Sequence, residues 1–461
     1  MPPKKRPSDM DGEGSAKKAK KKSDSSNGAD SGDSATVYPT IKLEGSLISG
    51  TLLMCGGTNW DLIGRNSVPK GTKNQGGRNL WGPHKMEALE NVKVRTVVSS
   101  PLACHSIIID TDGKVYTFGR NEKGQLGHGD TDRRDKPTLV SCMEDVNVVD
   151  AACGKNHSLL LTEYGQVYAF GENKMGQLGL GHQSNYEPTP SLIAHKGPAV
   201  RRLACGADFS VIVDVVGSLY SFGCPEYGQL GHNTDGKYFV SSNKLAFQCV
   251  LKPRRVPLFI EKQRDKTVVP IDEVEIVDAA CGANHTIVVD RKKRIFTWGF
   301  GGYGRLGHNE PKDEMIPRLL KGWDDPNRGA VLVAAGTAYT MAVNEIGCLY
   351  LWGQHKPTGE AAMYPKPVQD LSGWQVRSIG CANRSIVLAA DESTVSWGPS
   401  PTYGELGYGE FKPKSSSYAQ EVKPLEGIYV HKVACGYGHT LMIARSDTEE
   451  EKEKIDKLPD Y

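Results

Sequence analysis

Residues 152–158, Ala-Cys-Gly-Lys-Asn-His-Ser, precede a short apolar run, and residues 170–179, Phe-Gly-Glu-Asn-Lys-Met-Gly-Gln-Leu-Gly, follow it. Both motifs recur along the chain. The His position of the first motif is occupied in turn by His105, His157, Phe209, His285, Tyr339, Arg384 and His439. These seven positions divide 334 residues into six steps. The period of about 56 residues indicates a propeller, a solenoid or another repeat array.

The second motif is an aromatic-Gly pair, six or seven variable residues and then Leu-Gly. Its copies lie at residues 118–127, 170–179, 222–231, 298–307 and 397–407, with reduced copies at 55–64 and 352–353. Turn dipeptides such as Asp112-Gly113 stand before the alternating strands, and Asp-Gly is a strong hairpin signal. Each unit is therefore predicted to be a four-stranded β-meander, which must stack on its neighbours to bury both faces.

The two chain ends carry complementary halves of one repeat. Residues 439–444 have no aromatic-Gly strand after them, and Thr51–Cys55 have no His-Ser strand before them. Pairing these segments completes a blade and hides two sheet edges. The sequence therefore predicts an all-β fold, a seven-bladed β-propeller over residues 41–446 that is closed by pairing of its N- and C-terminal strands.

The N-terminal region, residues 1–40, is rich in Ser, Lys, Gly and Asp and is predicted to be a disordered basic tail. It contains two basic clusters in the layout of a bipartite nuclear import signal, formed by Lys4, Lys5, Arg6 and by Lys17, Lys18, Lys20, Lys21, Lys22. Two spaced clusters suit an import receptor with two acidic grooves. The alternatives are a solubilising arm or a tail that binds phosphate.

The last residues, 447–461, carry seven acidic side chains against three lysines. Asp447 to Glu450 resemble a capping box, and Glu450 stands four residues before Lys454. A short exposed helix is predicted over residues 447–458. It is either a solvated tail or a segment that docks on the propeller through Ile455 and Leu458.

Composition and motifs exclude several classes of function. Net charge is only +2, and no apolar run reaches the ~20 residues of a membrane span. No CxxC pair, typical of zinc or redox sites, occurs among the eleven cysteines. The string at residues 302–307 fits a dinucleotide fingerprint, but it is one copy of the repeated motif. The repeated His, Cys and Gly residues are interpreted as structural. We therefore expect no catalytic residue, no cofactor and no metal, in a reduced intracellular protein.

The two motifs together resemble the regulator of chromosome condensation repeat over residues ~45–445, and five stretches narrow the match to one branch of that family: 58–65, 171–179, 222–233, 298–308 and 396–401. The resemblance implies a non-enzymatic regulator of small GTPases of the Rac and Ral type, either an exchange factor or a sequestering protein. It implies the nucleus and nucleolus in interphase, centromere, spindle midzone and midbody in mitosis, and some cytoplasmic protein. Roles in mitosis and cell spreading are implied with it.

The spacing from Phe209 to His285 is 76 residues, whereas the neighbouring steps have 52 and 54. The extra length lies at about residues 235–270. A basic, partly apolar insertion on a propeller rim is a natural docking element, although a tolerated rim loop is the alternative. The founding family member inserts a wedge into its GTPase. The resemblance implies that the insertion at about residues 235–270 is the counterpart of that wedge.

The contact residues predicted on this basis are Arg254, Arg255, Lys262 and Arg264, with Trp81 from the connector 65–95 as a further candidate. A second interpretation of the chain remains open. In it, the protein is an adaptor anchored to chromatin, centromere or microtubule components by its basic tail, without direct activity on a GTPase. Binding through that tail would fall steeply with salt.

Overall fold

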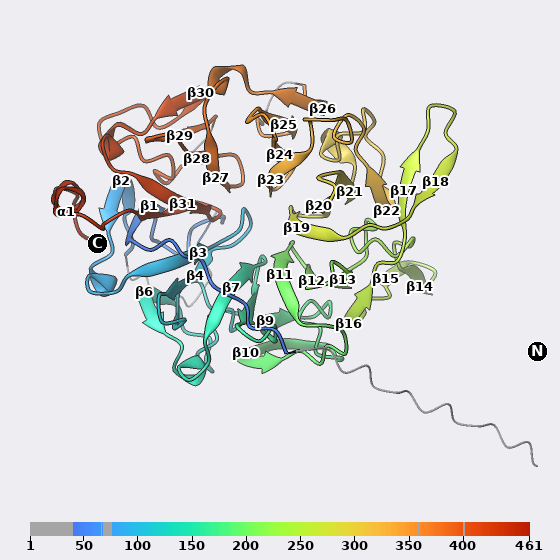
Figure 1. The fold of residues 1–461 in the computed structure, drawn as a ribbon. Helices are drawn as coiled ribbons and strands as arrows, with labels where there is room; N and C mark the ends of the chain where they lie inside the picture. Colours follow the sequence, from blue (N-terminus) through green and yellow to red (C-terminus); the bar gives the residue numbers. More distant parts are fainter. Residues whose placement is uncertain (1–39, 66, 68–75, 358–359, 400–401) are drawn as a thin grey trace, which may run out of the picture. The chain divides into compact units, whose positions relative to one another are not determined.

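The structure, a computed structural model, describes residues 40–65, 67, 76–357, 360–399 and 402–461. Residues 1–39 of the predicted tail, with its two basic clusters, lie outside the described residues. The described chain from residue 40 onward forms eight sheets, of which seven are arranged around a centre as blades (Figure 1) and the eighth is a two-stranded hairpin. The predicted seven-bladed propeller is therefore confirmed. We number the blades in chain order from the first complete one. No helix in the described part of the chain is long and apolar enough to cross a membrane.

The first three blades follow one another along the chain. The first contains β3 (Val94–Val98), β4 (His105–Asp110), β5 (Val115–Gly119) and β6 (Arg134–Leu139). The second contains β7 (Val148–Cys153), β8 (His157–Thr162), β9 (Val167–Asn173) and β10 (Ser184–Leu192). The third contains β11 (Val200–Cys205), β12 (Phe209–Asp214), β13 (Leu219–Gly223) and β16 (Val250–Arg255), and beside it lies a separate hairpin of β14 (Lys237–Ser241) and β15 (Lys244–Phe247).

The fourth blade is the largest, since two extra strands extend its sheet. Its strands are β19 (Ile276–Cys281), β20 (His285–Asp290), β21 (Ile295–Gly299), β22 (Glu314–Leu319), β17 (Phe259–Lys262) and β18 (Val268–Ile271). The fifth contains β23 (Ala330–Ala335), β24 (Tyr339–Asn344), β25 (Leu349–Gly353) and β26 (Ala362–Pro367). The sixth contains β27 (Val376–Cys381), β28 (Ile386–Ala390), β29 (Ser393–Gly398) and β30 (Ser416–Glu421).

The seventh blade closes the ring and is built from both ends of the described chain. Its strand order is β2 (Asn79–Lys85), β1 (Thr51–Gly57), β32 (His439–Ala444) and β31 (Val430–Cys435). β1 and β32 are antiparallel and in continuous register from Thr51 opposite Ala444 to Gly56 opposite His439. The predicted closure is therefore confirmed. Short 3-10 turns connect some strands, at Glu87–Leu89, Ser141–Met143, Gly302–Gly304, Gln369–Leu371 and Lys423–Leu425.

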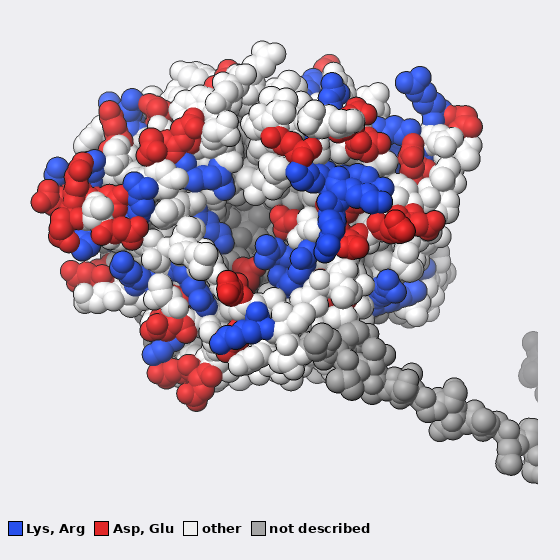
Figure 2. Space-filling view, viewed as in Figure 1, with Lys and Arg blue, Asp and Glu red and all other residues white. Residues whose placement is uncertain are grey.

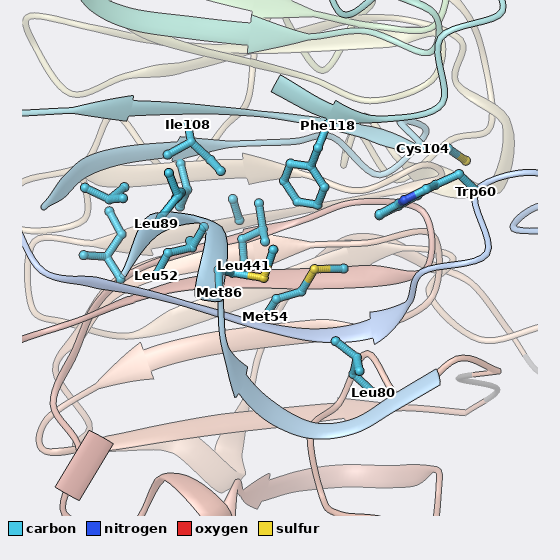
Figure 3. Close-up of a cluster of buried hydrophobic side chains, with 14 of the residues drawn as sticks. Leu52, Met54, Trp60, Leu80, Met86, Leu89, Cys104, Ile108, Phe118 and Leu441 are labelled. Atoms are coloured by element: carbon cyan, nitrogen blue, oxygen red, sulfur yellow. The ribbon is translucent and has the colours of Figure 1, made fainter. Parts of the chain in front are cut away.

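Neighbouring blades share their cores, because the apolar side chains of one sheet pack against the face of the next. Between the seventh and first blades, Met54 and Trp60 lie beside Phe118, and the rings of Trp60 and Phe118 meet edge to face at 5.6 Å (Figure 3). All three side chains are fully buried. The two chain ends are thus held by packing as well as by the β1–β32 ladder.

The repeated histidines connect successive blades. Nε2 of His105 lies 2.9 Å from Oγ of Ser158, and Nε2 of His157 lies 2.9 Å from Oγ of Ser210. The same contact joins His285 to Thr340 and His439 to Ser106. The predicted structural role is confirmed, and the partner in each case is a hydroxyl of the next blade. Burial lowers the pKa of His105 and His157 to about 3, so these rings are neutral.

The glycine of the same motif makes room for the ring. A Cβ on Gly154 would lie 2.0 Å from Cε1 of His157, and a Cβ on Gly436 would lie 2.0 Å from Cε1 of His439. The interpretation of these glycines as structural is therefore confirmed, because a side chain there would clash with the motif's own imidazole.

The C-terminal segment is docked, not solvated. Helix α1 (Glu449–Asp456) is capped by Thr448, with Glu451 as the reciprocal residue of the capping box. The predicted box at Asp447–Glu450 is therefore wrong by one residue, because the Thr448 hydroxyl accepts from the backbone N–H of Glu451. Ile455 is buried in the core of the sixth and seventh blades, and Leu458 packs beside it. The solvated-tail alternative is wrong.

Candidate partner-binding surface

The 24 additional residues in the step from Phe209 to His285 are divided between two places. Gly223 of β13 pairs with Val250 of β16, 27 positions later, whereas Gly119 of β5 pairs with Arg134 of β6, 15 positions later. Twelve residues are thus added between the third and fourth strands of the third blade. They form the separate β14–β15 hairpin.

The other twelve residues follow the third blade. Strand β19 begins at Ile276, 21 positions after the end of β16 at Arg255, whereas β7 begins at Val148, nine positions after the end of β6 at Leu139. This second addition forms the β17–β18 hairpin, which projects from the rim at the upper right of Figure 1. β17 runs parallel to β22, and the Phe259 ring meets the Phe296 ring at 5.1 Å.

The prediction that Arg254 and Arg255 belong to a projecting insertion is wrong, because β16 is the regular outer strand of the third blade. Arg254 lies opposite Ser221 and Arg255 opposite Tyr220 in the β13–β16 ladder. Both side chains are exposed on the rim. Burial lowers the pKa of His232 to about 4, and the positive charge of nearby Arg254 contributes to the shift.

Lys262 and Arg264 lie on the second hairpin but differ in their surroundings. Lys262 Nζ lies 2.6 Å from both carboxylate oxygens of Glu314, a buried side chain that also binds Arg318 at 2.8 Å. Lys262 therefore attaches the hairpin to the fourth blade. Arg264 lies in the exposed turn between β17 and β18, where it is available to a partner.

The β14–β15 hairpin carries the most exposed apolar cluster of the insertion. The exposed fractions of Tyr238, Phe239 and Val240 are 50%, 75% and 56%, and that of Leu245 on the facing strand is 44%. These residues are not among the contact residues predicted from the sequence. Their signal was a run of three apolar residues between polar neighbours, which a buried strand also produces.

Trp81 does not join this surface. It lies in β2, the outer strand of the seventh blade, so its predicted position in a loop is wrong. Two blades, the first and second, separate it from the third. The Lys414 ammonium stands 3.9 Å from the centre of its ring, and its backbone carbonyl accepts from Gly409. Trp81 thus packs beside its own blade. The other four predicted contact residues, Arg254, Arg255, Lys262 and Arg264, lie on the third and fourth blades.

The central channel is lined by the inner strands of the seven blades and encloses a cavity of 760 Å³. Figure 2 shows a hollow at the centre of the face, with side chains of both charges around it. Lining residues include Arg201, Arg202 and Lys432 together with Asp150 and Asp278. Among the residues that the structure describes, no three His, Cys, Asp or Glu side chains come together as a metal ion would require.

Comparison with known proteins gives the family. Residues 51–442 match the RCC1-like domain. The chain is 57% identical to Protein RCC2 of Homo sapiens over 423 residues, which cover 91% of this chain and 81% of that protein. It is 56% identical to the Protein RCC2 homolog of Danio rerio over 427 residues, which cover 92% of this chain and 86% of that protein.

Solved structures show the same fold at low sequence identity. Prp20p from Saccharomyces cerevisiae, whose structure was described with its binding properties to Gsp1p and histones, matches with a TM-score of 0.68 and 18% identity. The match covers 90% of this chain and 95% of Prp20p. Yeast RCC1 (Prp20) in a structure with Kap60 bound gives a TM-score of 0.70, 18% identity, and coverage of 97% and 99%. The chain belongs to the RCC1-like domain family and, within it, to the group of the RCC2 proteins.

Proposed function

We propose that this propeller regulates small GTPases of the Rac and Ral type by direct binding, without covalent catalysis. The observation that carries the proposal is the β14–β15 hairpin, whose Tyr238, Phe239 and Val240 are each at least half exposed. Contiguous exposed apolar residues with a polar rim are typical of protein interaction sites. Arg254 and Arg255 are exposed on the third blade, from which the hairpin extends, and add positive charge to this side of the rim.

The hairpin suits the mechanical task of an exchange factor. GTPases hold their nucleotide through phosphate contacts and Mg²⁺, so release requires a surface that displaces these contacts and no bond-breaking residue. The five residues of β14 span roughly 16 Å as an extended strand, at about 3.3 Å per residue. That length and the exposed aromatic residues of β14 allow entry into a cleft. Binding without displacement would make the protein a sequestering regulator.

The test is release of fluorescent mant-GDP from purified Rac, Ral and Ran in the presence of the full chain, together with a binding measurement for each GTPase. Phe239→Ala and the double change Arg254→Glu with Arg255→Glu should each weaken binding at least tenfold, since aromatic and Arg anchors contribute about 2 kcal/mol or more to an interface. Faster release identifies an exchange factor. Tight binding without faster release identifies a sequestering regulator.

A matched control exists in the fifth blade. Lys366 lies opposite Leu351 in the β25–β26 ladder, the position that Arg254 occupies opposite Ser221 in the third blade. Lys366→Glu changes the same kind of exposed outer-strand charge two blades away, so it should leave GTPase binding unchanged. Absence of binding to every GTPase in the panel would refute the proposal and favour the adaptor anchored to chromatin, centromere or microtubule components.

We further propose that the two N-terminal basic clusters, Lys4–Arg6 and Lys17–Lys22, are bound by a nuclear import receptor. The protein would then be found in the nucleus and nucleolus in interphase and at the centromere, midzone and midbody in mitosis. The solved complex of yeast RCC1 (Prp20) with Kap60 supports the idea for the fold family. Alanine substitutions in both clusters should move a fluorescently tagged chain to the cytoplasm. Unchanged nuclear accumulation would refute the import signal.

A further inference from the structure

Two cysteines face each other at the base of the β14–β15 hairpin. Cys224 directly follows β13, and Cys249 directly precedes β16. The last pair of the antiparallel ladder is Gly223 opposite Val250, so one further step places Cys224 opposite Cys249. Directly opposed residues have Cα atoms about 4.5–5.5 Å apart. A disulfide needs about 4.4–6.8 Å, so the bond can form without movement of the backbone.

The two thiols differ in character. The Cys249 thiol donates to the Phe247 carbonyl at 3.7 Å and to the Met175 sulfur at 3.9 Å. Interaction with the neighbouring Cys224 thiol lowers the pKa of Cys249, whereas the pKa of Cys224 is raised. Cys249 is half-buried, whereas Cys224 is buried. The more accessible sulfur is therefore also the one that more readily becomes a thiolate, the reactive form.

We propose that Cys224 and Cys249 form a peroxide-sensitive disulfide site. The Cys249 thiolate attacks one oxygen of a peroxide, the O–O bond breaks, and Cys249 becomes a sulfenic acid. The other oxygen takes up a proton, which balances the one that the Cys249 thiol lost, and leaves as water or alcohol. The Cys224 sulfur then attacks the Cys249 sulfur, the S–O bond breaks, and the hydroxyl leaves as water with the Cys224 proton. Two thiols lose two electrons in total, and one peroxide is reduced.

The other cysteines lack this combination of proximity and access. Cys55 and Cys435 both lie opposite Thr440, one on each side of β32. They are separated by two strand spacings, about 9.6 Å, which exceeds the reach of a disulfide. Cys142 is exposed, but burial of its sulfur raises the pKa, and the ladder places no cysteine opposite it among the described residues. Cys142 is therefore a control for unassisted oxidation.

The bond would close the loop from Cys224 to Cys249, which contains the whole β14–β15 hairpin. Formation would fix the hairpin's base against β13 and so restrict how the exposed aromatic residues are presented. The proposal of this disulfide site is independent of the proposed GTPase function, because the experiment detects the Cys224–Cys249 bond directly.

The test treats the full reduced chain with hydrogen peroxide, blocks free thiols with N-ethylmaleimide and analyses peptides by mass spectrometry. We expect a Cys224–Cys249 cross-link that lacks two hydrogen atoms and is reversed by dithiothreitol. Cys249 should lose its free thiol several-fold faster than Cys142 does. Cys224→Ser should leave Cys249 as a sulfenic acid that dimedone labels, and Cys249→Ser should leave Cys224 reduced.

Two results would overturn the proposal. One is oxidation of Cys142 while Cys249 keeps its free thiol. The other is oxidation of Cys249 in the unsubstituted chain without a cross-link to Cys224. The dimedone experiment is independent of the disulfide's effect on folding, because it is performed on Cys224→Ser protein whose circular dichroism matches that of the parent.

Discussion

Replacing His157 with Phe tests the role of the buried histidine ring and should change the pH dependence of stability. Phe209 occupies the equivalent position in the third blade, so the fold accepts a phenyl ring there. In the folded protein, His157 Nε2 contacts the Ser210 hydroxyl, and that hydroxyl donates to the Gln177 carbonyl at 2.8 Å. Since the hydroxyl proton is already used, the imidazole is the donor. Ser210 keeps its carbonyl partner in the variant.

Two effects of opposite sign determine the result. Loss of one buried hydrogen bond costs about 1 kcal/mol at pH 8, where the histidine is neutral in both states. Burial lowers the pKa of His157 from 6.5 to about 3 in the folded protein. At pH 5 the unfolded chain therefore binds a proton that the folded chain does not. Stability falls as the pH falls from 6.5 toward 3, by about 2 kcal/mol for this residue at pH 5.

The variant lacks that proton uptake. His157→Phe should be about 1 kcal/mol less stable than the parent at pH 8 and about 1 kcal/mol more stable at pH 5, with the curves crossing near pH 6. Equilibrium urea unfolding between pH 5 and 8, followed by tryptophan fluorescence and circular dichroism, measures the difference. Parallel stability curves for parent and variant would refute the reasoning, because they would mean that His157 binds its proton equally in both states.

Further substitutions test other parts of the structure. Ile455→Ala should lower the free energy of unfolding by about 2–4 kcal/mol, since it leaves a cavity where α1 meets the sixth and seventh blades; an unchanged urea midpoint would contradict docking. Gly154→Ala should destabilise by more than 1 kcal/mol, because the added Cβ overlaps the imidazole; thermal melting checks this. Lys262→Glu places a carboxylate against Glu314, which should detach the β17–β18 hairpin from the fourth blade and speed tryptic cleavage within it. Arg264→Glu is the control and should leave the cleavage rate at the remaining sites of the hairpin unchanged.

The blade count and the ring closure could be predicted because each depends on a short repeated pattern. The unpaired segment Thr51–Cys55 had one complementary strand available, His439–Ala444, and the structure pairs them. The contacts between blades were less accessible to sequence reasoning. Their signal was present, since Ser or Thr follows the His position in all seven copies, but periodicity alone does not show that a hydroxyl serves the preceding blade.

The location of the third blade's outer strand was missed for a physical reason. Pro253 lies within β16, and a proline is usually taken as evidence against a strand. The outer strands β6 and β26 also contain prolines, at Pro137 and Pro365. An outer edge strand tolerates proline because one side of its backbone needs no partner. If proline in outer strands had been expected, Arg254 would have been assigned to the outer strand of the third blade. The β14–β15 hairpin would then have been recognised as an insertion before that strand.

The docking of the C-terminal segment could not be decided from composition. Seven acidic residues favour a solvated helix, and only Ile455 and Leu458 suggest a contact. The structure adds backbone hydrogen bonds that no side-chain pattern reveals, from Lys85 N–H to the Pro459 carbonyl and from Glu87 N–H to the Tyr461 carbonyl. The final residues thereby extend the edge of the seventh blade and cover part of β2.

The central claim, that this propeller binds a small GTPase through its rim insertion, is tested most directly by hydrogen exchange of the full chain with and without Rac, Ral or Ran. Bound GTPase should slow amide exchange in the β14–β15 hairpin, residues 237–247, and in the β17–β18 turn around Arg264. The outer strand of the fifth blade, which contains Lys366, should exchange as before. Protection confined to other blades, or no protection by any of the three GTPases, would contradict the claim.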